Sequence, residues 1–431
     1  MKRNTFFLLF AVLLLAACSH DKKQSQSVCE QDPNSGVVYE MNVRQYTPEG
    51  TFAAAEAQLP RLKKLGVDIL WLMPIHPIGV EGRKGSLGSY YAPFDYKNVN
   101  PEFGTLEDFD HFLAAAHNLG IKVILDWVAN HTSPDSKWID EHLHEWYLLD
   151  SVGKPVVQYD WTDIAPLDWE KSPKAMCDAM EDAMRFWLLR GVDGFRCDVA
   201  HQIPVSFWKP AFDRFRKEFP GTYYLAEGER PDLQTAFDAT YAWELHHMMN
   251  SIAQGKKPAK DLAAYLVRDD AAYQTVAHPK KSVSAKRGSL RLMFTSNHDE
   301  NSWSGTEMER MGEYAPALAV LTFTLPHSQP LIYTGQEVGF NHRFLFFEKD
   351  TVPDWTYNDC TKFYQSLTTL RHNHLSLQPN APYELLNTND SCFAFRRFYQ
   401  GDTVSVFLNL SHSPVEWNGE CVPAAGWKIC E

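Results

Sequence analysis

The stretch GFRCDVAH, Gly194–His201, places a charged pair where an apolar strand ends. Val192–Asp198 has the composition of a short buried strand, and the amphipathic stretch Ala175–Arg190 before it predicts a helix. Arg196 and Asp198 are two positions apart, so their side chains are expected on the same face of the strand. Buried strands that end in charged groups are typical of parallel sheets with a functional edge.

The same alternation of helix and strand recurs along most of the chain. Further strands are expected at 37–42, 68–73, 121–126, 223–227, 291–296 and 331–333, with helices near 51–65 and 105–119 among them. Repeated units of this length predict an α/β fold, a (β/α)8 TIM barrel. The competing fold is an open doubly wound sheet, but no glycine-rich phosphate loop follows the first strand.

The periodicity changes at two places, which predicts the domain organisation. From His131 the regular pattern lapses, so we expect a small insert after strand 3, at 132–172. The last part of the chain alternates with a period of two residues, which predicts a C-terminal antiparallel β domain, a β-sandwich, at 376–431. The catalytic barrel is then expected to span 36–375.

The N-terminus has the pattern of an export signal. Lys2 and Arg3 precede an apolar run, Phe6–Leu15, that is too short to span a bilayer comfortably. The residues LAAC that end at Cys18 resemble a bacterial lipobox, so 1–18 is expected to be a lipoprotein signal peptide and Cys18 the lipidation site. Polar residues 19–35 would form a tether. We expect an exported protein, lipid-anchored to a bacterial membrane on the periplasmic side or the cell surface; an ordinary cleaved signal peptide is the alternative.

Composition narrows the range of partners. The 431 residues carry a formal net charge of −13, which argues against a nucleic-acid partner and fits a neutral substrate. The membrane would be contacted through the lipid anchor only. Of the 8 cysteines, Cys421 and Cys430 could form a disulfide in an exported protein, and no spacing indicates a zinc site.

Polar groups gather where the predicted strands end. These groups are Asp126, Asn130 and His131 after the third strand, Arg196 and Asp198 on the fourth, Glu227 on the fifth, and Asn297, His298 and Asp299 on the seventh. In a parallel barrel all these ends lie on one rim, so the side chains converge although they are far apart in the sequence. A single acidic strand end is commonly a helix cap, but four carboxylates with an arginine and two histidines predict a site.

Cleavage of an acetal needs such a set. One carboxyl protonates the leaving oxygen, and a second carboxylate attacks or stabilises the oxocarbenium-like centre. Arg196 beside Asp198 is expected to keep that acid ionised, which suits a nucleophile. Glu227 has no cation beside it in its own strand, so burial is expected to raise its pKa and suit it to general acid catalysis.

Four motifs resemble the conserved regions of the α-amylase family of glycoside hydrolases, family 13. They are DWVANH (126–131), GFRCD (194–198), LAEGE (225–229) and TSNHDE (295–300), in the family's order. The resemblance implies Asp198 as nucleophile, Glu227 as acid/base and Asp299 as transition-state stabiliser. It also implies a sugar subsite lined by Tyr91 (from GSYYAPFDY), Asp126, His131, Arg196 and His298. The family mechanism is retaining, with carboxyl groups roughly 5–5.5 Å apart.

The resemblance leaves a structural calcium ion open. Asn130 matches the family's asparagine ligand, and His201 lies where a backbone carbonyl ligand is expected. Pro166 replaces the aspartate expected before Leu167, and proline has no side-chain oxygen for a hard cation. Asp163 and Asp168 are the alternative donors.

The resemblance favours hydrolysis of α-1,4 bonds in starch, maltodextrin or related α-glucans. Val199 directly after the nucleophile also occurs in members that cut α-1,6 bonds, and a Lys-His pair found in many starch-cleaving members is absent. The alternatives are therefore a cyclomaltodextrinase or neopullulanase, an α-1,6-glucosidase or a transglycosylase. A non-catalytic glucan-binding lipoprotein is the remaining one, but such a protein is expected to have lost one of the three acids.

Overall fold

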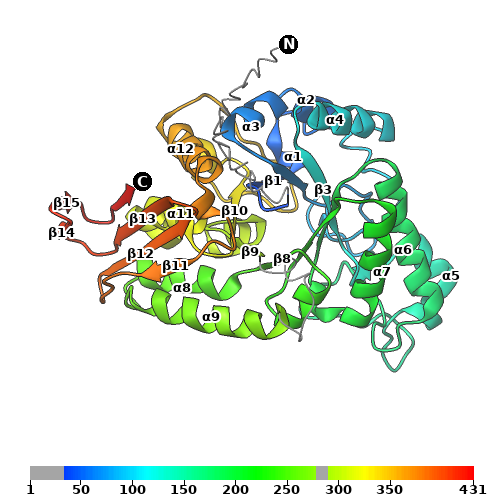
Figure 1. Cartoon of the computed structure of the whole chain (residues 1–431). Helices are drawn as coiled ribbons and strands as arrows, with labels where there is room; N and C mark the ends of the chain where they lie inside the picture. The colour runs from blue at the N-terminus through cyan, green and yellow to red at the C-terminus, as the bar shows by residue number, and fades with distance from the viewer. Residues whose placement is uncertain (1–33, 278–289) are drawn as a thin grey trace, which may run out of the picture. The chain divides into compact units, whose positions relative to one another are not determined.

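The computed structural model describes residues 34–277 and 290–431, and at its centre is a closed barrel of eight parallel strands (Figure 1). Around the barrel the order is β1-β10-β9-β8-β7-β6-β3-β2. The strands are β1 (Val38–Met41), β2 (Ile69–Leu72), β3 (Lys122–Trp127), β6 (Gly194–Cys197), β7 (Tyr223–Ala226), β8 (Ala239–Tyr241), β9 (Leu290–Met293) and β10 (Ser328–Tyr333). The closed ring confirms the predicted (β/α)8 barrel and excludes the open sheet.

Helices surround the barrel and shield the outer faces of its strands (Figure 1). They are α1 (Val43–Tyr46), α2 (Phe52–Glu56), α3 (Leu59–Leu65), α4 (Leu106–Asn118), α6 (Lys174–Leu189), α7 (Val205–Glu218), α8 (Trp243–Ala253), α9 (Asp261–Ala277), α10 (Glu307–Met311), α11 (Ala315–Thr324) and α12 (Asp359–Asn373). The single helix expected at 51–65 is wrong: two helices occupy it, α2 and α3. Pro60, in the first turn of α3, has no N–H to continue the bonding of α2.

Alternation along the barrel strands positions the polar side chains. Inward-facing side chains farther from the carboxyl ends of the strands form a second apolar core, which includes Val38, Ile69, Ile124 and Leu225. Because side chains alternate, the next inward positions toward the strand ends are Glu40, Trp71, Asp126, Arg196 and Glu227. The register between β3 and β6 pairs Asp126 with Arg196 directly. The apolar pattern that closes the barrel therefore also sets a layer of polar groups at its mouth.

The region after β3 contains little regular structure. It holds β4 (His131–Thr132), which pairs with β5 (Ala165–Pro166), and the helix α5 (Lys137–Trp146). Leu167 donates its backbone N–H to the carbonyl oxygen of Asn130 at 3.0 Å, which ties the returning end of this insert to the end of β3. The insert therefore begins and ends beside the mouth of the barrel.

The C-terminal part is an antiparallel sheet, as the period-two pattern predicted. Its order is β11-β12-β13-β16, and a separate hairpin pairs β14 with β15. The bounds are β11 (Tyr383–Leu385), β12 (Cys392–Tyr399), β13 (Asp402–Asn409), β14 (Val415–Trp417), β15 (Glu420–Val422) and β16 (Trp427–Cys430). Phe393 and Phe395 belong to the main core, whereas Phe407 on the opposite face stacks on Trp417 of the hairpin at 5.0 Å. The second layer of the expected sandwich is thus only this hairpin.

Several predictions concern the ends of the chain. Residues 1–33, with the predicted signal peptide, Cys18 and most of the tether, lie outside the described residues. Within the described ranges, no helix combines the length and apolar character needed to cross a bilayer. Cys421 and Cys430 are both free and exposed, so the suggested disulfide between them is wrong for this structure.

Candidate active site

A pocket of about 520 Å³ lies at the carboxyl ends of the barrel strands, a size typical of small-molecule sites. The lining includes the carboxylates Asp160, Asp163, Asp198, Glu227 and Asp299, the aromatic residues Tyr91, Trp161, Trp303, Phe346 and Phe347, and also Lys84, Ser89, His131 and His298. The structure therefore brings together all three predicted catalytic acids. They come from β6, β7 and the segment after β9, as the strand-end argument required.

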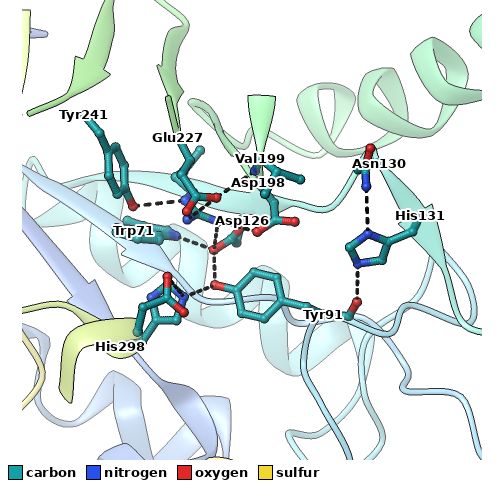
Figure 2. Close-up of polar contacts among 12 residues, drawn as sticks. Trp71, Tyr91, Asp126, Asn130, His131, Asp198, Val199, Glu227, Tyr241 and His298 are labelled. Carbon is teal, nitrogen blue, oxygen red and sulfur yellow. Dashed lines mark hydrogen bonds and ion pairs between the residues drawn. The ribbon is translucent and has the colours of Figure 1, made fainter. Parts of the chain in front are cut away.

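One guanidinium organises the floor of this site (Figure 2). Arg196 is fully buried, and its Nη1 donates to Oδ1 of Asp126 at 2.9 Å and to Oδ1 of Asp198 at 3.1 Å. Its Nη2 lies 3.0 Å from Oε2 of Glu227, and its Nε donates to the Tyr241 hydroxyl at 3.1 Å. Three carboxylates from the ends of three neighbouring strands, β3, β6 and β7, therefore share a single cation.

Glu227 has no cation in its own strand, but a cation from the neighbouring strand lies beside it. Arg196 reaches Glu227 across the gap between two neighbouring strands, and sequence spacing reports only neighbours along one strand. Glu227 Oε2 also accepts the backbone N–H of Val199 at 2.7 Å. In the free protein, Glu227 thus lies beside a guanidinium cation and accepts a hydrogen bond from a backbone N–H.

The pKa directions follow from these contacts and reverse the sequence-based expectation. Burial raises the pKa of Asp198 well above its usual value, and the charge of Glu227 adds to the rise; Arg196 offsets only part of it. Burial also opposes ionisation of Glu227, but Arg196 and the Val199 N–H outweigh it and lower the pKa of Glu227. In the free protein the proton of this pair is therefore favoured on Asp198.

Val199 has an unusual backbone conformation for a β-branched residue. Its φ is +36° and its ψ is 41°, in the left-handed region. Such a conformation costs of the order of 1–3 kcal/mol and is kept where the surroundings require it. Here it directs the Val199 N–H at Glu227, so the residue after Asp198 helps to set the charge of the second acid.

A chain of hydrogen bonds links Tyr91 to both sides of the pocket (Figure 2). The Tyr91 hydroxyl donates to Oδ2 of Asp126 at 2.9 Å and lies 2.8 Å from Nε2 of His298. His298 Nδ1 lies 2.5 Å from Oε1 of Glu40. Burial opposes a charge on His298, but Asp299 and Glu40 outweigh burial and raise the pKa of His298 to about 9. His298 is therefore a cation at neutral pH, and it can donate from both ring nitrogens.

His131 behaves differently from His298. Its Nε2 lies 2.8 Å from the carbonyl oxygen of Tyr91, and the side chain of Asn130 lies 3.3 Å from its Nδ1 (Figure 2). Burial lowers the pKa of His131 to about 4, so this ring is neutral at pH 7. The two histidines at the mouth thus differ in charge.

Two predicted substrate-binding residues lie beneath the pocket rather than in its lining. Asp126 and Arg196 are both fully buried and contact other side chains of the site. Trp71 Nε1 donates to Oδ2 of Asp126 at 3.1 Å, which holds this carboxylate from below. Asp126 and Arg196 therefore position the lining residues. Tyr91 lines the pocket, whereas Tyr90 is buried under the Arg44 guanidinium.

Sequence reasoning missed Glu40, Trp71 and Tyr241, which all belong to the layer that supports Arg196 or His298. A signal was present, because Glu40 is an acid in the otherwise uncharged strand VYEM and lies two positions after inward-facing Val38. The insert contains four tryptophans, Trp138, Trp146, Trp161 and Trp169, and of these Trp161 lines the pocket. Trp138, Trp146 and Trp169 pack in or against the main core.

Three of the residues proposed for calcium, His201, Asp163 and Asp168, already face cationic side chains. The His201 carbonyl oxygen accepts Nη1 of Arg230 at 3.0 Å, and Oδ2 of Asp168 lies 2.5 Å from Nζ of Lys171. Lys84 Nζ lies 3.7 Å from Oδ1 of Asp163. Each alternative oxygen thus faces a cationic side chain, whereas calcium needs six to eight free oxygen ligands. Across the described ranges no group of three or more acidic, histidine or cysteine side chains could hold a metal ion.

The pocket is lined with carboxylates and lies at the C-terminal mouth of a closed parallel barrel, which is where enzymes with this fold have their active sites. The family model described as the alpha amylase catalytic domain matches residues 26–164 and 145–375. The chain belongs to the alpha-amylase family.

Relatives of known sequence and structure agree with this assignment. The chain is 28% identical over 405 residues to the alpha-amylase MalA of Haloarcula japonica, which covers 88% of this chain and 56% of that protein. It is 31% identical over 401 residues to an alpha-1,4-glucan:maltose-1-phosphate maltosyltransferase of Streptomyces coelicolor, which covers 85% and 56%. The chain thus spans about half the length of these curated relatives. The crystal structure of an alpha-amylase from Lactobacillus plantarum superposes with a TM-score of 0.81 at 30% identity, covering 92% and 99%.

Proposed function

We propose that this protein is a retaining glycoside hydrolase that cleaves α-1,4-glucosidic bonds in maltodextrins, starch or related α-glucans. The observation that carries the proposal is the pair of pocket-lining carboxyls, Asp198 and Glu227, that contact the two Nη atoms of one buried arginine. The two groups thus lie within reach of the same guanidinium, and a short separation is what a double-displacement mechanism requires.

In the proposed reaction a carboxylate oxygen of Asp198 attacks the anomeric carbon, and the bond to the leaving sugar breaks. Glu227 gives its proton to the departing oxygen, so that a glycosyl ester on Asp198 and a free sugar hydroxyl result. Water then attacks the same carbon, Glu227 takes its proton, and Asp198 leaves as a carboxylate. His298 and Asp299 would bind hydroxyl groups of the attacked sugar, and the ring of Tyr91 would pack against it.

The reaction needs the proton on Glu227, whereas the free pair favours it on Asp198. A substrate that displaces water from the pocket brings an acceptor, the glycosidic oxygen, to Glu227, and it brings the electrophilic carbon to Asp198. Both contacts favour transfer of the proton from Asp198 to Glu227. We therefore propose that substrate binding itself sets the reactive protonation state.

Transfer to a sugar acceptor in place of water is a second candidate. One relative, 31% identical, is named a maltosyltransferase. The first half-reaction is the same in both cases, and the second differs only in whether water or a sugar hydroxyl attacks the glycosyl ester. The ratio of transfer to hydrolysis products decides between them.

Incubation of the purified protein with maltoheptaose, and in parallel with pullulan and isomaltotriose, tests the proposal. We expect cleavage of maltoheptaose, and the first product seen by NMR should have the α configuration at its new reducing end. Intact maltoheptaose after prolonged incubation would overturn the function, and a β-configured first product would overturn the retaining mechanism.

A chelator tests the inference that no calcium ion supports the insert. Since the candidate oxygens face Arg230, Lys171 and Lys84, we expect EDTA to leave the melting temperature within about 1 °C and the rate unchanged. Loss of a resident ion should cost several degrees, because a ligand at 100 times its Kd contributes about 2.7 kcal/mol. A drop of that size, restored by calcium alone, would contradict this account.

We also propose that the protein is exported and anchored through a lipid on Cys18. The support is the basic and apolar order of residues 2–15 and the LAAC motif that ends at Cys18. In cells fed labelled palmitate, the protein should take up label and sediment with membranes, and Cys18→Ala should abolish both. Unlabelled wild-type protein would refute the anchor.

A further inference from the structure

The ring order of the barrel gives the pocket two distinct sides. β7, which Glu227 directly follows, lies opposite β1, whose two neighbours in the ring are β2 and β10. Lys84 lies in the segment after β2, and Phe347 lies in the segment after β10. The insert with Trp161 follows β3, the next strand beyond β2. The Lys84 and Phe347 segments therefore start three places from β7 in the ring, on the side away from Glu227, and the insert starts two places from β7.

These three segments are joined into a continuous wall. On one side, Lys84 Nζ donates to the backbone carbonyl oxygen of Asp160 at 2.7 Å. On the other side, the backbone N–H of Ser86 donates to Oε1 of Glu348 at 2.9 Å, and Leu87 N–H donates to the carbonyl oxygen of Phe347 at 3.1 Å. The segment 82–87 thus bridges the insert and the segment after β10.

Two glycines show how tightly this bridge is held. A Cβ at Gly82 would lie 2.6 Å from the carbonyl oxygen of Thr162, in the insert. A Cβ at Gly85 would lie 2.5 Å from the Cβ of Phe347. Both residues also have a positive φ, +69° and +62°, which glycine adopts without strain. The bridge is therefore in close contact on both flanks, with the Thr162 carbonyl oxygen on one side and Phe347 on the other.

The wall carries charged side chains as well as aromatic rings. Lys84 lines the pocket, and an ammonium has three N–H donors, of which the Asp160 carbonyl accepts one. Asp163, whose side chain is only 6% exposed, lies 3.7 Å from Lys84 and also lines the pocket. A cation, a carboxylate and the rings of Trp161 and Phe347 are the groups that bind the hydroxyls and the apolar face of a terminal sugar.

We propose that the Lys84 segment closes the pocket on the side away from Glu227, so that the protein takes α-glucan chains by their non-reducing ends. This rests on the proposed function, because Glu227 must face the leaving group. C1 and C4 are at opposite ends of a glucose ring, so the non-reducing part of the chain extends from the attacked sugar toward the wall. Lys84 is then a specificity-determining residue that recognises the chain end, and products are short and cut from that end.

Nitrophenyl maltoheptaoside, used free and with O4 and O6 of its terminal glucose blocked as an ethylidene acetal, tests the wall. We expect the wild-type protein to prefer the free substrate by at least about tenfold in kcat/KM, because the acetal has no room beside Lys84 and removes two hydroxyls. Lys84→Ala should lower this preference, through a higher KM for the free substrate with kcat little changed. Lys84→Arg should keep part of the preference.

Control variants distinguish a failure of this inference from a failure of the proposed hydrolase function. Lys97→Ala removes an exposed lysine that pairs with Asp182 and does not line the pocket, and it should leave the preference unchanged. The double variant Lys84→Ala/Phe347→Ala opens both flanks and should lower the preference further. Equal cleavage of the two substrates by the wild-type protein overturns the closed end but keeps the hydrolase. Cleavage of neither substrate overturns the hydrolase and the closed end with it.

Discussion

Asp198→Asn should lower kcat/KM for maltoheptaose by at least about 10⁴-fold, because an amide cannot form the glycosyl ester with the anomeric carbon. The substitution keeps the size of the side chain and leaves an oxygen for Nη1 of Arg196, which now lies 3.1 Å from Oδ1. The loss should therefore fall on kcat, with binding of substrate little changed. Initial rates and the KM measured on the same preparations check this.

The same variant should be more stable than the wild type at neutral pH. Burial raises the pKa of Asp198, so its ionised form is disfavoured in the folded protein. The unfolded chain ionises this group near its ordinary pKa of about 3.9, and stability is then lost as the pH rises toward the folded pKa. Asparagine has no such loss. The melting temperature of Asp198→Asn should exceed that of the wild type at pH 7, and the two should converge below about pH 3.

Asp182→Asn is the matched control, because Asp182 is exposed and forms an ion pair with Lys97 outside the pocket. It should change neither the rate nor the pH dependence of unfolding. A lower melting temperature of Asp198→Asn at pH 7, or a rate within tenfold of the wild type, would remove Asp198 from the role of buried nucleophile.

The sequence predicted the barrel because its signals are local. Each strand is a short apolar run, and period-two alternation within the run sets which side chains face inward. Asp126 and Arg196 could therefore be assigned to strand ends without a structure. The break between α2 and α3 was missed, because an amphipathic pattern continues through Pro60 although the backbone hydrogen bonds cannot.

The electrostatics of the site could not be predicted in the same way. Sequence spacing showed that Arg196 lies near Asp198, but the contact with Glu227 depends on the register and closeness of β6 and β7. A pKa responds to every charge within a few ångströms, whichever strand carries it. Glu40, which helps to keep His298 charged, likewise lies 258 positions away from it in the sequence.

The walls of the pocket were the least predictable part. Lys84, Phe346 and Phe347 lie in segments without helix or strand structure, and Trp303 lies in a short π-helix, Glu300–Ser304, so their positions depend on contacts between segments. Nothing in the local sequence around Lys84 indicates that its Nζ reaches the insert. Loop contacts of this kind decide specificity, whereas the catalytic acids stand on regular strands that a pattern reveals.

Glu227→Gln should lower kcat/KM for maltoheptaose by about 10²- to 10⁴-fold, because a glucosyl leaving group needs a proton. Fluoride leaves without one, so the first step with α-maltosyl fluoride should change by less than about tenfold. The second step still lacks its base, so a burst of fluoride should precede slow turnover. Azide, which attacks without a base, should restore turnover and yield maltosyl azide. Glu218→Gln, on the outer helix α7, is the control and should behave as the wild type.

Stability gives an independent check, since Glu227 and Asp198 should respond in opposite directions. Arg196 and the Val199 N–H lower the pKa of Glu227 despite its burial, so its charge stabilises the fold above the unfolded pKa of about 4.3. Glutamine is neutral, so it cannot form an ion pair with Arg196. The melting temperature of Glu227→Gln should therefore fall at pH 7, while that of Asp198→Asn rises. If both variants moved in the same direction, the two acids would not differ in protonation state, and the shared guanidinium would not be what distinguishes them.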